Sequence, residues 1–221
     1  MLATPAYADE FKLFARYDSD WIYHGVSETL GEPAVGLGLD WQSRSRLFAG
    51  MATYRMLDDS NAPRPWSTLI YAGVGAAVGE RGFLSGSIQR RNFPTSNIPW
   101  NYTEFEVEYD LRIGPRSRLR LRADYSPNYY SLDASAVTAE AEFHHQLNDR
   151  IFIRTRVGAL EASDSSPLPD YHYGSLGMGL RLKPFVFDVS AHITSEADAR
   201  IVGLETFSQP RWVARVVWQI Y

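Results

Sequence analysis

Residues 103–125 read Thr-Glu-Phe-Glu-Val-Glu-Tyr-Asp-Leu-Arg-Ile-Gly-Pro-Arg-Ser-Arg-Leu-Arg-Leu-Arg-Ala-Asp-Tyr, and this stretch decides the fold. Apolar and charged side chains alternate on both sides of Gly114-Pro115, a dipeptide typical of a turn. Successive side chains of a strand point to opposite faces. The stretch therefore predicts a β-hairpin with an apolar face and a charged face, acidic on the first arm and mainly arginine on the second.

Similar segments run along the whole chain. They are Phe11–Tyr23, Ala34–Gln42, Leu47–Met56, Trp66–Val78, Phe83–Phe93, Glu104–Ile113, Arg118–Tyr125, Ala134–Leu147, Arg150–Leu160, Tyr171–Leu182, Phe185–Thr194 and Arg211–Tyr221. Most are longer than the five or six residues usual in soluble sheets, and they match the roughly 9–11 residues of a tilted transmembrane strand. The connections between them alternate between short and long.

That alternation places all short turns at one end and all long loops at the other. Outer-membrane barrels have this arrangement, with short periplasmic turns and long extracellular loops. The sequence therefore predicts an all-β fold: one antiparallel up-and-down transmembrane β-barrel of about 12 strands. The soluble alternative is a lipocalin-like barrel or a β-sandwich, which would turn the apolar faces inward.

Composition narrows the function further. The net charge of −4 gives no support to nucleic-acid binding, and the absence of cysteine excludes disulfides and cysteine metal sites. No apolar run reaches the length of a transmembrane helix. Ala6-Tyr7-Ala8 resembles a signal-peptidase site, which predicts residues 1–8 as the end of a signal peptide and 9–221 as the barrel. An arbitrary alanine-rich terminus is the alternative.

Aromatic residues gather near the ends of the expected strands. In a transmembrane barrel they would form girdles at the two membrane interfaces. The residues assigned to these girdles are Trp21, Tyr23, Trp41, Phe48, Trp66, Phe93, Trp100, Tyr102, Tyr125, Tyr129, Tyr130, Phe185, Trp212 and Trp218.

Several motifs resemble those of the TorF-type porins of proteobacteria. They are Ser19–Ser27, Pro33–Val35, Leu39–Trp41, Asn92–Pro94, Asn101–Glu104 and Tyr125–Tyr129, in the same order over most of the chain. His24 and Glu28 stand where that family usually has arginine and glutamine. The resemblance implies an outer-membrane barrel with a porin role and no particular solute.

The charged face of the barrel would point into the lumen. Pore-lining residues are then expected on four consecutive strands: Glu104, Glu106, Glu108, Asp110, Arg112, Arg118, Arg120, Arg122, Asp124, Glu140, Glu142, Arg154 and Arg156. A turn centred on Pro115 would set Glu108 opposite Arg122 and Asp110 opposite Arg120. A slip of one residue would carry these charges into lipid, so the register is strongly constrained.

Two functions fit such a lumen. The first is an outer-membrane channel for passive diffusion of small polar or ionic solutes through a narrow charged bore. The alternative is a non-conducting structural or partner-binding barrel, whose lumen is plugged by arginine–carboxylate pairs. An enzyme is not expected: Ser190 and His192 point inward, whereas the serine and histidine of outer-membrane lipases face lipid.

The expected surroundings follow from the barrel. They are the outer membrane of a Gram-negative bacterium with both termini in the periplasm, lipid and lipopolysaccharide, and the barrel-assembly machinery during biogenesis. An envelope protein partner or a homo-oligomer is compatible with the long loops. No cofactor and no metal are expected, because His144 and His145 are adjacent and point to opposite faces.

Overall fold

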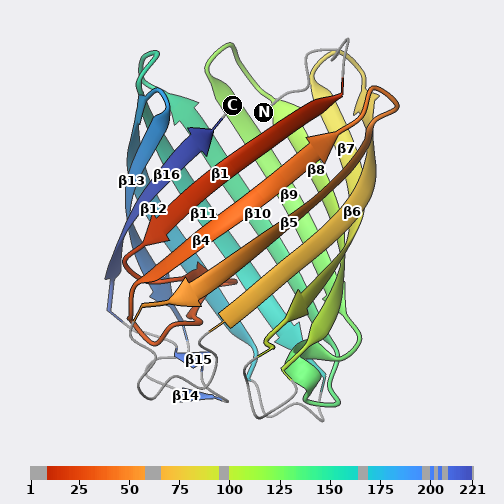
Figure 1. Ribbon diagram of the computed structural model, residues 1–221, viewed down its shortest axis with the longest axis vertical. Coiled ribbons are helices and arrows are strands. Elements are labelled where there is room, and N and C mark those ends of the chain that lie inside the picture. Colours follow the sequence, from red (N-terminus) through yellow and green to blue (C-terminus); the bar gives the residue numbers. More distant parts are fainter. Residues whose placement is uncertain are drawn as a thin grey trace.

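Twelve antiparallel strands close into a barrel in the computed structural model (Figure 1). The structure describes residues 9–57, 66–94, 100–163, 169–195, 200–201, 204–205 and 209–220. The expected signal peptide, residues 1–8, lies outside this part of the chain. The barrel strands are β1 (Glu10–Asp18), β4 (Ala34–Gln42), β5 (Leu47–Met56), β6 (Trp66–Val78), β7 (Gly82–Asn92), β8 (Tyr102–Arg112), β9 (Ser117–Ser126), β10 (Ala136–Gln146), β11 (Ile151–Ala162), β12 (Tyr171–Leu182), β13 (Phe185–Thr194) and β16 (Arg211–Ile220).

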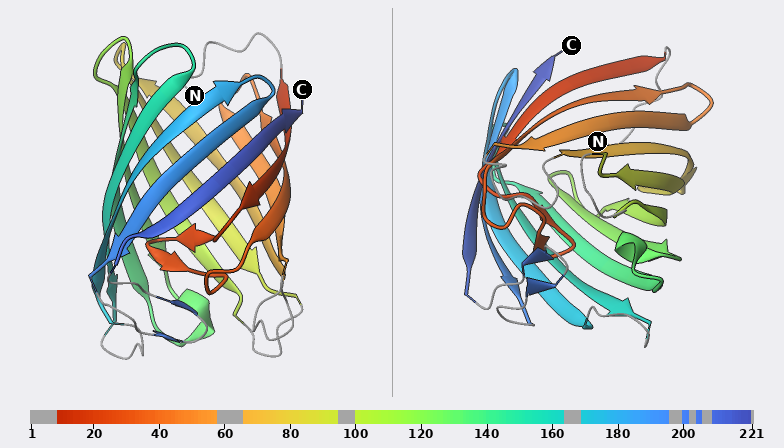
Figure 2. Two further views of the ribbon diagram at one scale, coloured as in Figure 1. Left: turned by 90° about the vertical axis from the view of Figure 1, so that its left-hand side faces the viewer. Right: turned by 60° about the horizontal axis from the view of Figure 1, so that its bottom comes forward.

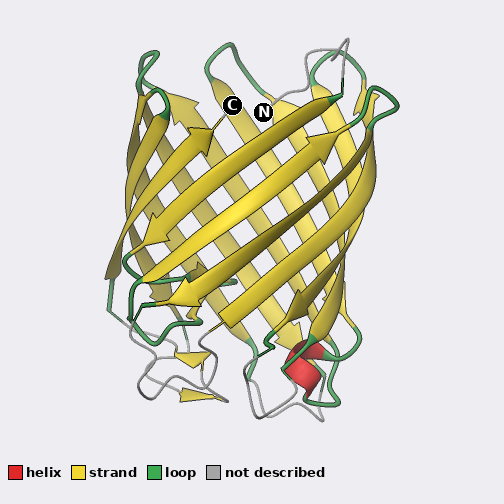
Figure 3. Ribbon diagram, in the orientation of Figure 1, coloured by secondary structure: helices red, strands yellow, loops and turns green. Residues whose placement is uncertain are grey.

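Neighbouring strands in the chain are neighbours in the barrel, and β1 closes it against β16. The predicted up-and-down fold is thereby confirmed. The connections alternate in length, so one end carries the short connections and the other the long ones (Figure 3). We call these the turn end and the loop end. β1 begins and β16 ends at the turn end (Figure 1).

The register of the central hairpin is the one expected from its sequence. Glu108 pairs with Arg122 and Asp110 with Arg120 across β8 and β9. The same parity continues to β10 and β11, where Glu142 lies between Arg120 and Arg156. This register puts every charge of the hairpin's polar face into the lumen.

Apolar side chains cover the outer wall between the two ends. Leu37, Val107, Val157 and Leu176 are 55–61% exposed, although each sits in the middle of a strand. A soluble protein does not leave so continuous an apolar surface in water. The inside-out distribution is that of a transmembrane barrel, and it excludes the lipocalin-like alternative. Within the described residues, no helix has the length and hydropathy needed to cross a membrane.

Val107 provides a test of this outer surface. Val107→Arg is expected to destabilise the barrel in phospholipid bilayers, lowering its free energy of unfolding by about 2–4 kcal/mol, because an arginine near the midplane must leave water. Val107→Leu, which keeps the position apolar, is the matched control. Denaturant titration in vesicles measures both, and equal stability of the two variants would contradict a lipid-facing wall.

The inner wall is shaped by large aromatic rings that lie over glycines. Phe14 lies over Gly38, and Tyr71 lies over Gly50 on the neighbouring strand, at positions where any Cβ would overlap the ring. Such ring-on-glycine contacts fill the strand surface that glycine leaves bare. They also narrow the lumen near these strands.

Two expectations about the first strand and the aromatic residues were wrong. β1 ends at Asp18, so Trp21 and Tyr23 do not continue it. Several residues assigned to girdles pack inside the loop end of the barrel instead: Trp21, Phe93, Trp100, Tyr102, Tyr129 and Tyr130 are buried, and Tyr23 is partly buried. Trp212 and Trp218 do lie exposed on the outer wall. Aromatic character alone does not distinguish a lipid interface from the packing of an internal segment.

Candidate functional site

Alternating arginines and carboxylates line the lumen along the neighbouring strands β9, β10 and β11. Arg122 of β9 contacts Glu140 of β10 at 3.1 Å and its own strand's Asp124 at 3.3 Å. Arg156 of β11 contacts Glu142 at 2.6 Å and Glu140 at 3.3 Å. Opposite charges at this spacing stabilise each other and hold long side chains in place. These contacts form a continuous network rather than isolated pairs.

A second group of charges faces this network from the strands that close the barrel. Asp18 accepts hydrogen bonds from Arg16 on β1 and Arg215 on β16, the latter at 2.7 Å. Arg154 on β11 contacts Asp188 on β13 at 2.9 Å. Only Arg154 of these five was among the expected pore-lining residues. The alternation of side chains along each strand also points the other four inward. A single charge on a mainly apolar strand is, however, a weaker sequence signal than four successive inward charges on one strand.

All 13 expected pore-lining residues belong to the inward-facing register of β8, β9, β10 and β11. Their surroundings differ. Glu104 and Asp124 are nearly fully buried at the loop end, whereas Arg112 reaches the turn end and donates to the backbone carbonyl of Glu80. Whether they line a conducting path remains a prediction.

The connection between β1 and β4 folds into the barrel at the loop end (Figure 2). We call residues 19–33 the plug. It contains two short strands, β2 (Ile22–Tyr23) and β3 (Val26–Ser27). His24, Val26 and Ser27 are at most 1% exposed, which a surface loop would not be. The sequence had assigned residues 19–23 to the first strand segment, Phe11–Tyr23, and did not predict a buried segment here.

The plug contacts the barrel on all sides. Tyr23 donates to Glu104 on β8 at 2.6 Å, and Thr194 on β13 donates to the Gly25 carbonyl at 2.6 Å. Trp21 packs against Tyr54 of β5 with ring centroids 3.9 Å apart and the rings tilted by 46°. Burial, followed by the Glu104 charge, raises the pKa of Tyr23 well above its usual range, so this phenol stays a donor. The plug therefore spans the width of the lumen.

Glu28 of the plug is held by an arginine and a tyrosine. Arg91 on β7 contacts it at 3.1 Å, and both side chains are almost fully buried. The Tyr130 hydroxyl donates to the other carboxylate oxygen of Glu28. The Arg91 guanidinium also lies 4.1 Å from the centre of the Tyr23 ring. A buried pair that loses one partner leaves an uncompensated charge, so Arg91 and Glu28 depend on each other.

His24 lies inside the barrel, beside β8 and β9. It is 1% exposed, with Nε2 3.6 Å from Asp124 and Nδ1 3.9 Å from Glu104. The Tyr23 ring stacks on it at 3.9 Å. The imidazole is therefore enclosed between the plug and the strands β8 and β9.

Gly25 permits the close approach of the plug to β12. Its φ of +78° is a left-handed conformation that glycine adopts without strain. A Cβ at this position would also overlap the Cβ of Tyr173. The sequence of the plug thus contains a glycine where its backbone touches the wall.

An aromatic cluster supports the plug from the opposite wall. Tyr129 and Tyr130 belong to a short 3₁₀ turn, η1 (Tyr129–Ser131), and pack against Tyr102 with centroids 4.6–5.1 Å apart. Val26 of the plug belongs to the same cluster. At the outer side, β3 pairs with β15 (Leu204–Glu205), which pairs with β14 (Arg200–Ile201). The last long connection therefore extends the plug's small sheet.

Open space is found toward the turn end. One cavity of about 530 Å³ is lined by residues of β9, β10, β12, β13 and β16, among them Arg118, His144 and Arg181. Another of about 400 Å³ is lined by Asp40, Tyr71 and Glu108, and it shares Asp110, Arg120 and Gln219 with the first. The lumen therefore combines a filled loop end with an accessible turn end.

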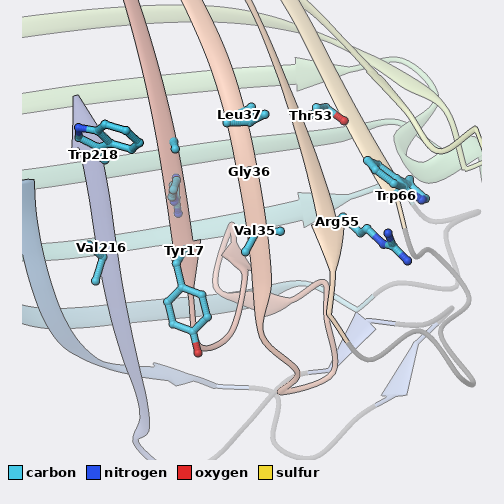
Figure 4. A pocket seen from close by; sticks show the side chains of 11 residues that line it. Tyr17, Val35, Gly36, Leu37, Thr53, Arg55, Trp66, Val216 and Trp218 are labelled. Carbon is cyan, nitrogen blue, oxygen red and sulfur yellow. The ribbon is translucent and has the colours of Figure 1, made fainter. Parts of the chain in front are cut away.

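A further groove, of about 480 Å³, lies on the outer wall (Figure 4). Tyr17, Val35, Leu37 and Trp218 line it, and all four belong to the apolar face. It is a depression in the membrane-facing surface and is separate from the lumen.

Ser190 and His192 are adjacent on the inner face of β13. The Ser190 Oγ lies 2.9 Å from the His192 Nε2, and it also donates to Asp188 at 3.4 Å. Ser190 is 1% exposed, so its hydroxyl does not meet the membrane. Among the described residues, no group of three histidine, aspartate or glutamate side chains is placed to hold a metal ion.

Known structures share this architecture. The chain is similar to a KdgM porin (TM-score 0.67, 7% identity, 95% of this chain and 99% of that chain) and to a NanC porin (TM-score 0.65, 8% identity, 96% and 100%). It is also similar to the COG4313 outer membrane channel from Pseudomonas putida F1 (TM-score 0.54, 9% identity, 99% and 100%). No family model and no curated protein matches the chain, so the resemblance to TorF-type porins stays a prediction. At these identities the likeness shows the fold, and the fold is the barrel of outer-membrane porins and channels.

Proposed function

We propose that this protein is an outer-membrane channel for small polar or ionic solutes, with its loop end closed by the plug in the conformation described above. The turn end would face the periplasm and the loop end the outside, as the lengths of the connections favour. The observation that carries the proposal is the combination of an apolar outer wall with a charged lumen that stays open at the turn end.

The size of the barrel supports passage of small solutes only. Eight-stranded barrels are filled by side chains, whereas porins of 16–18 strands leave a wide aqueous channel. Twelve strands lie between these cases, and the arginine–carboxylate network occupies part of the bore. Lipid and lipopolysaccharide would surround the wall, and folding would depend on the barrel-assembly machinery.

Planar-bilayer recording of the purified protein tests the proposal. Because the plug contacts all sides of the lumen, we expect a mostly closed baseline interrupted by brief openings, with a small unitary conductance. The openings are expected to lengthen at high voltage, which acts on the charges of the plug. No unitary conductance over a wide voltage range, in the intact protein and in a variant without the plug, would overturn the channel.

The second candidate is a non-conducting barrel that serves as an anchor or binds an envelope partner. The extent of the plug contacts favours it, since Arg91, Glu28 and His24 are all nearly inaccessible. In this candidate the arginine–carboxylate pairs would close the lumen in addition to the plug. This function predicts that the barrel stays silent in bilayers even when the plug is removed.

A further inference from the structure

The turn-end cavity of about 530 Å³ has more positive than negative charge among its lining residues. Four cations line it, Arg118, Arg120, Arg181 and Lys183, against two carboxylates, Asp110 and Glu142. A space of this size is in the range of small-molecule sites. The question is which of these charges are already neutralised by each other.

Both carboxylates already contact arginines. Glu142 contacts Arg156 at 2.6 Å and Arg120 at 3.8 Å. Asp110 lies 3.7 Å from Arg120, which also contacts Glu108 at 3.3 Å. Arg120 is therefore shared among three acids and is not available as a free cation.

Three cations remain without a carboxylate. Within the described residues, Arg118, Arg181 and Lys183 form no ion pair with any acidic side chain. Arg118 belongs to β9 and Arg181 to β12, while Lys183 follows β12 in the turn to β13. They thus surround one cavity from different strands rather than forming a run along one surface.

Arg181 is held in place on the cavity wall. Its guanidinium lies 4.5 Å from the centre of the Phe152 ring, and one of its nitrogens donates to His144 Nε2 at 3.0 Å. His144 pairs in register with Arg118. A guanidinium fixed by a ring and one hydrogen bond keeps its remaining N–H groups free for a ligand at little entropic cost.

We propose that this cavity is a binding site for small polyanionic solutes, with Arg118, Arg181 and Lys183 as the recognising groups. Carboxylates and phosphates share the chemistry: both accept paired hydrogen bonds from a guanidinium and charge-assisted bonds from an ammonium. The inference rests on the proposed function, because it names the solute class that would collect at the turn-end mouth of the channel.

Equilibrium binding to the folded protein in detergent micelles tests the site without requiring conductance. The probes are tricarballylate, which bears three carboxylates on a propane skeleton, pyrophosphate, and glycerol, the neutral triol on the same skeleton. We expect both anions to bind by calorimetry, with affinity falling as salt rises, and glycerol not to bind. Their relative affinities distinguish a carboxylate site from a phosphate site.

Arg118→Gln and Arg181→Gln are each expected to weaken anion binding by about ten-fold or more, since each removes charge-assisted hydrogen bonds. The matched control is Arg116→Gln, at the same end of the barrel, where Arg116 donates to the Leu147 carbonyl and does not line the cavity. Unchanged electrophoretic heat-modifiability would show that the variants fold.

Three results would overturn the site: no anion binding at millimolar concentration, equal binding of glycerol, or an Arg116 variant as weak as the other two. Conductance in potassium chloride is measured separately. If the protein conducts but binds neither anion, the proposed binding site is refuted and the proposed channel function stands. If the protein binds the anions but never conducts, the proposed channel function is refuted and the proposed binding site stands.

Discussion

Replacing residues 19–33 by a four-residue turn is expected to raise the unitary conductance several-fold and to abolish the closed baseline. Asp18 and Ala34, which flank the plug, are register partners on β1 and β4, so a turn as short as residues 43–46 between β4 and β5 can join them. The replacement removes the side chains that fill the loop end and leaves the barrel ladder intact. Planar-bilayer recording measures the change, and protection of the barrel from protease confirms folding.

The same variant separates the two candidate functions. If it conducts well, the plug is the barrier and the network around Arg122 and Arg156 leaves a passable bore. If it is as silent as the intact protein, the arginine–carboxylate pairs themselves close the lumen, and the non-conducting barrel is the better description. Gly25→Ala is a milder second variant. The added Cβ would overlap Tyr173 and make the left-handed backbone conformation of this residue unfavourable, so the substitution should displace the plug without shortening the chain.

The barrel could be predicted because its signal is local and repeated. Each strand alternates apolar and polar residues, and a register error would expose charges to lipid, so pairs such as Glu108 with Arg122 follow from the sequence and one turn position. The alternation in connection length then orders the strands without any knowledge of long-range contacts.

The plug could not be predicted in this way. Its residues show no period of two, and its partners are far away in the chain: Tyr23 and Glu104 are separated by 81 positions, and His24 and Tyr129 by 105. Buried aromatic residues there look the same in sequence as residues of a membrane interface. The polar side chains of Glu28 and His24 offer a hint, because such residues next to Trp21 and Val26 need internal partners when the apolar ones are buried.

Arg91→Gln is expected to increase the frequency of channel openings by roughly 150- to 5,000-fold, because breaking a buried ion pair typically costs about 3–5 kcal/mol. The substitution leaves Glu28 buried with Tyr130 as its remaining donor and removes the guanidinium that lies over Tyr23. The docked plug is destabilised, whereas the barrel strands keep their backbone pairing. Single-channel recording at fixed voltage gives the opening frequency directly.

The neighbouring arginine is the matched control. Arg90 is on the same strand but exposed, and it donates to Thr103 at 3.0 Å, so Arg90→Gln should leave the opening frequency unchanged. Combining Arg91→Gln with Glu28→Gln removes both charges and is expected to restore most of the closed state, since two neutral amides can satisfy each other in the same space. A double variant that opens as often as Arg91→Gln alone would show that the stacking of Arg91 on Tyr23, and not its charge on Glu28, holds the plug in the lumen.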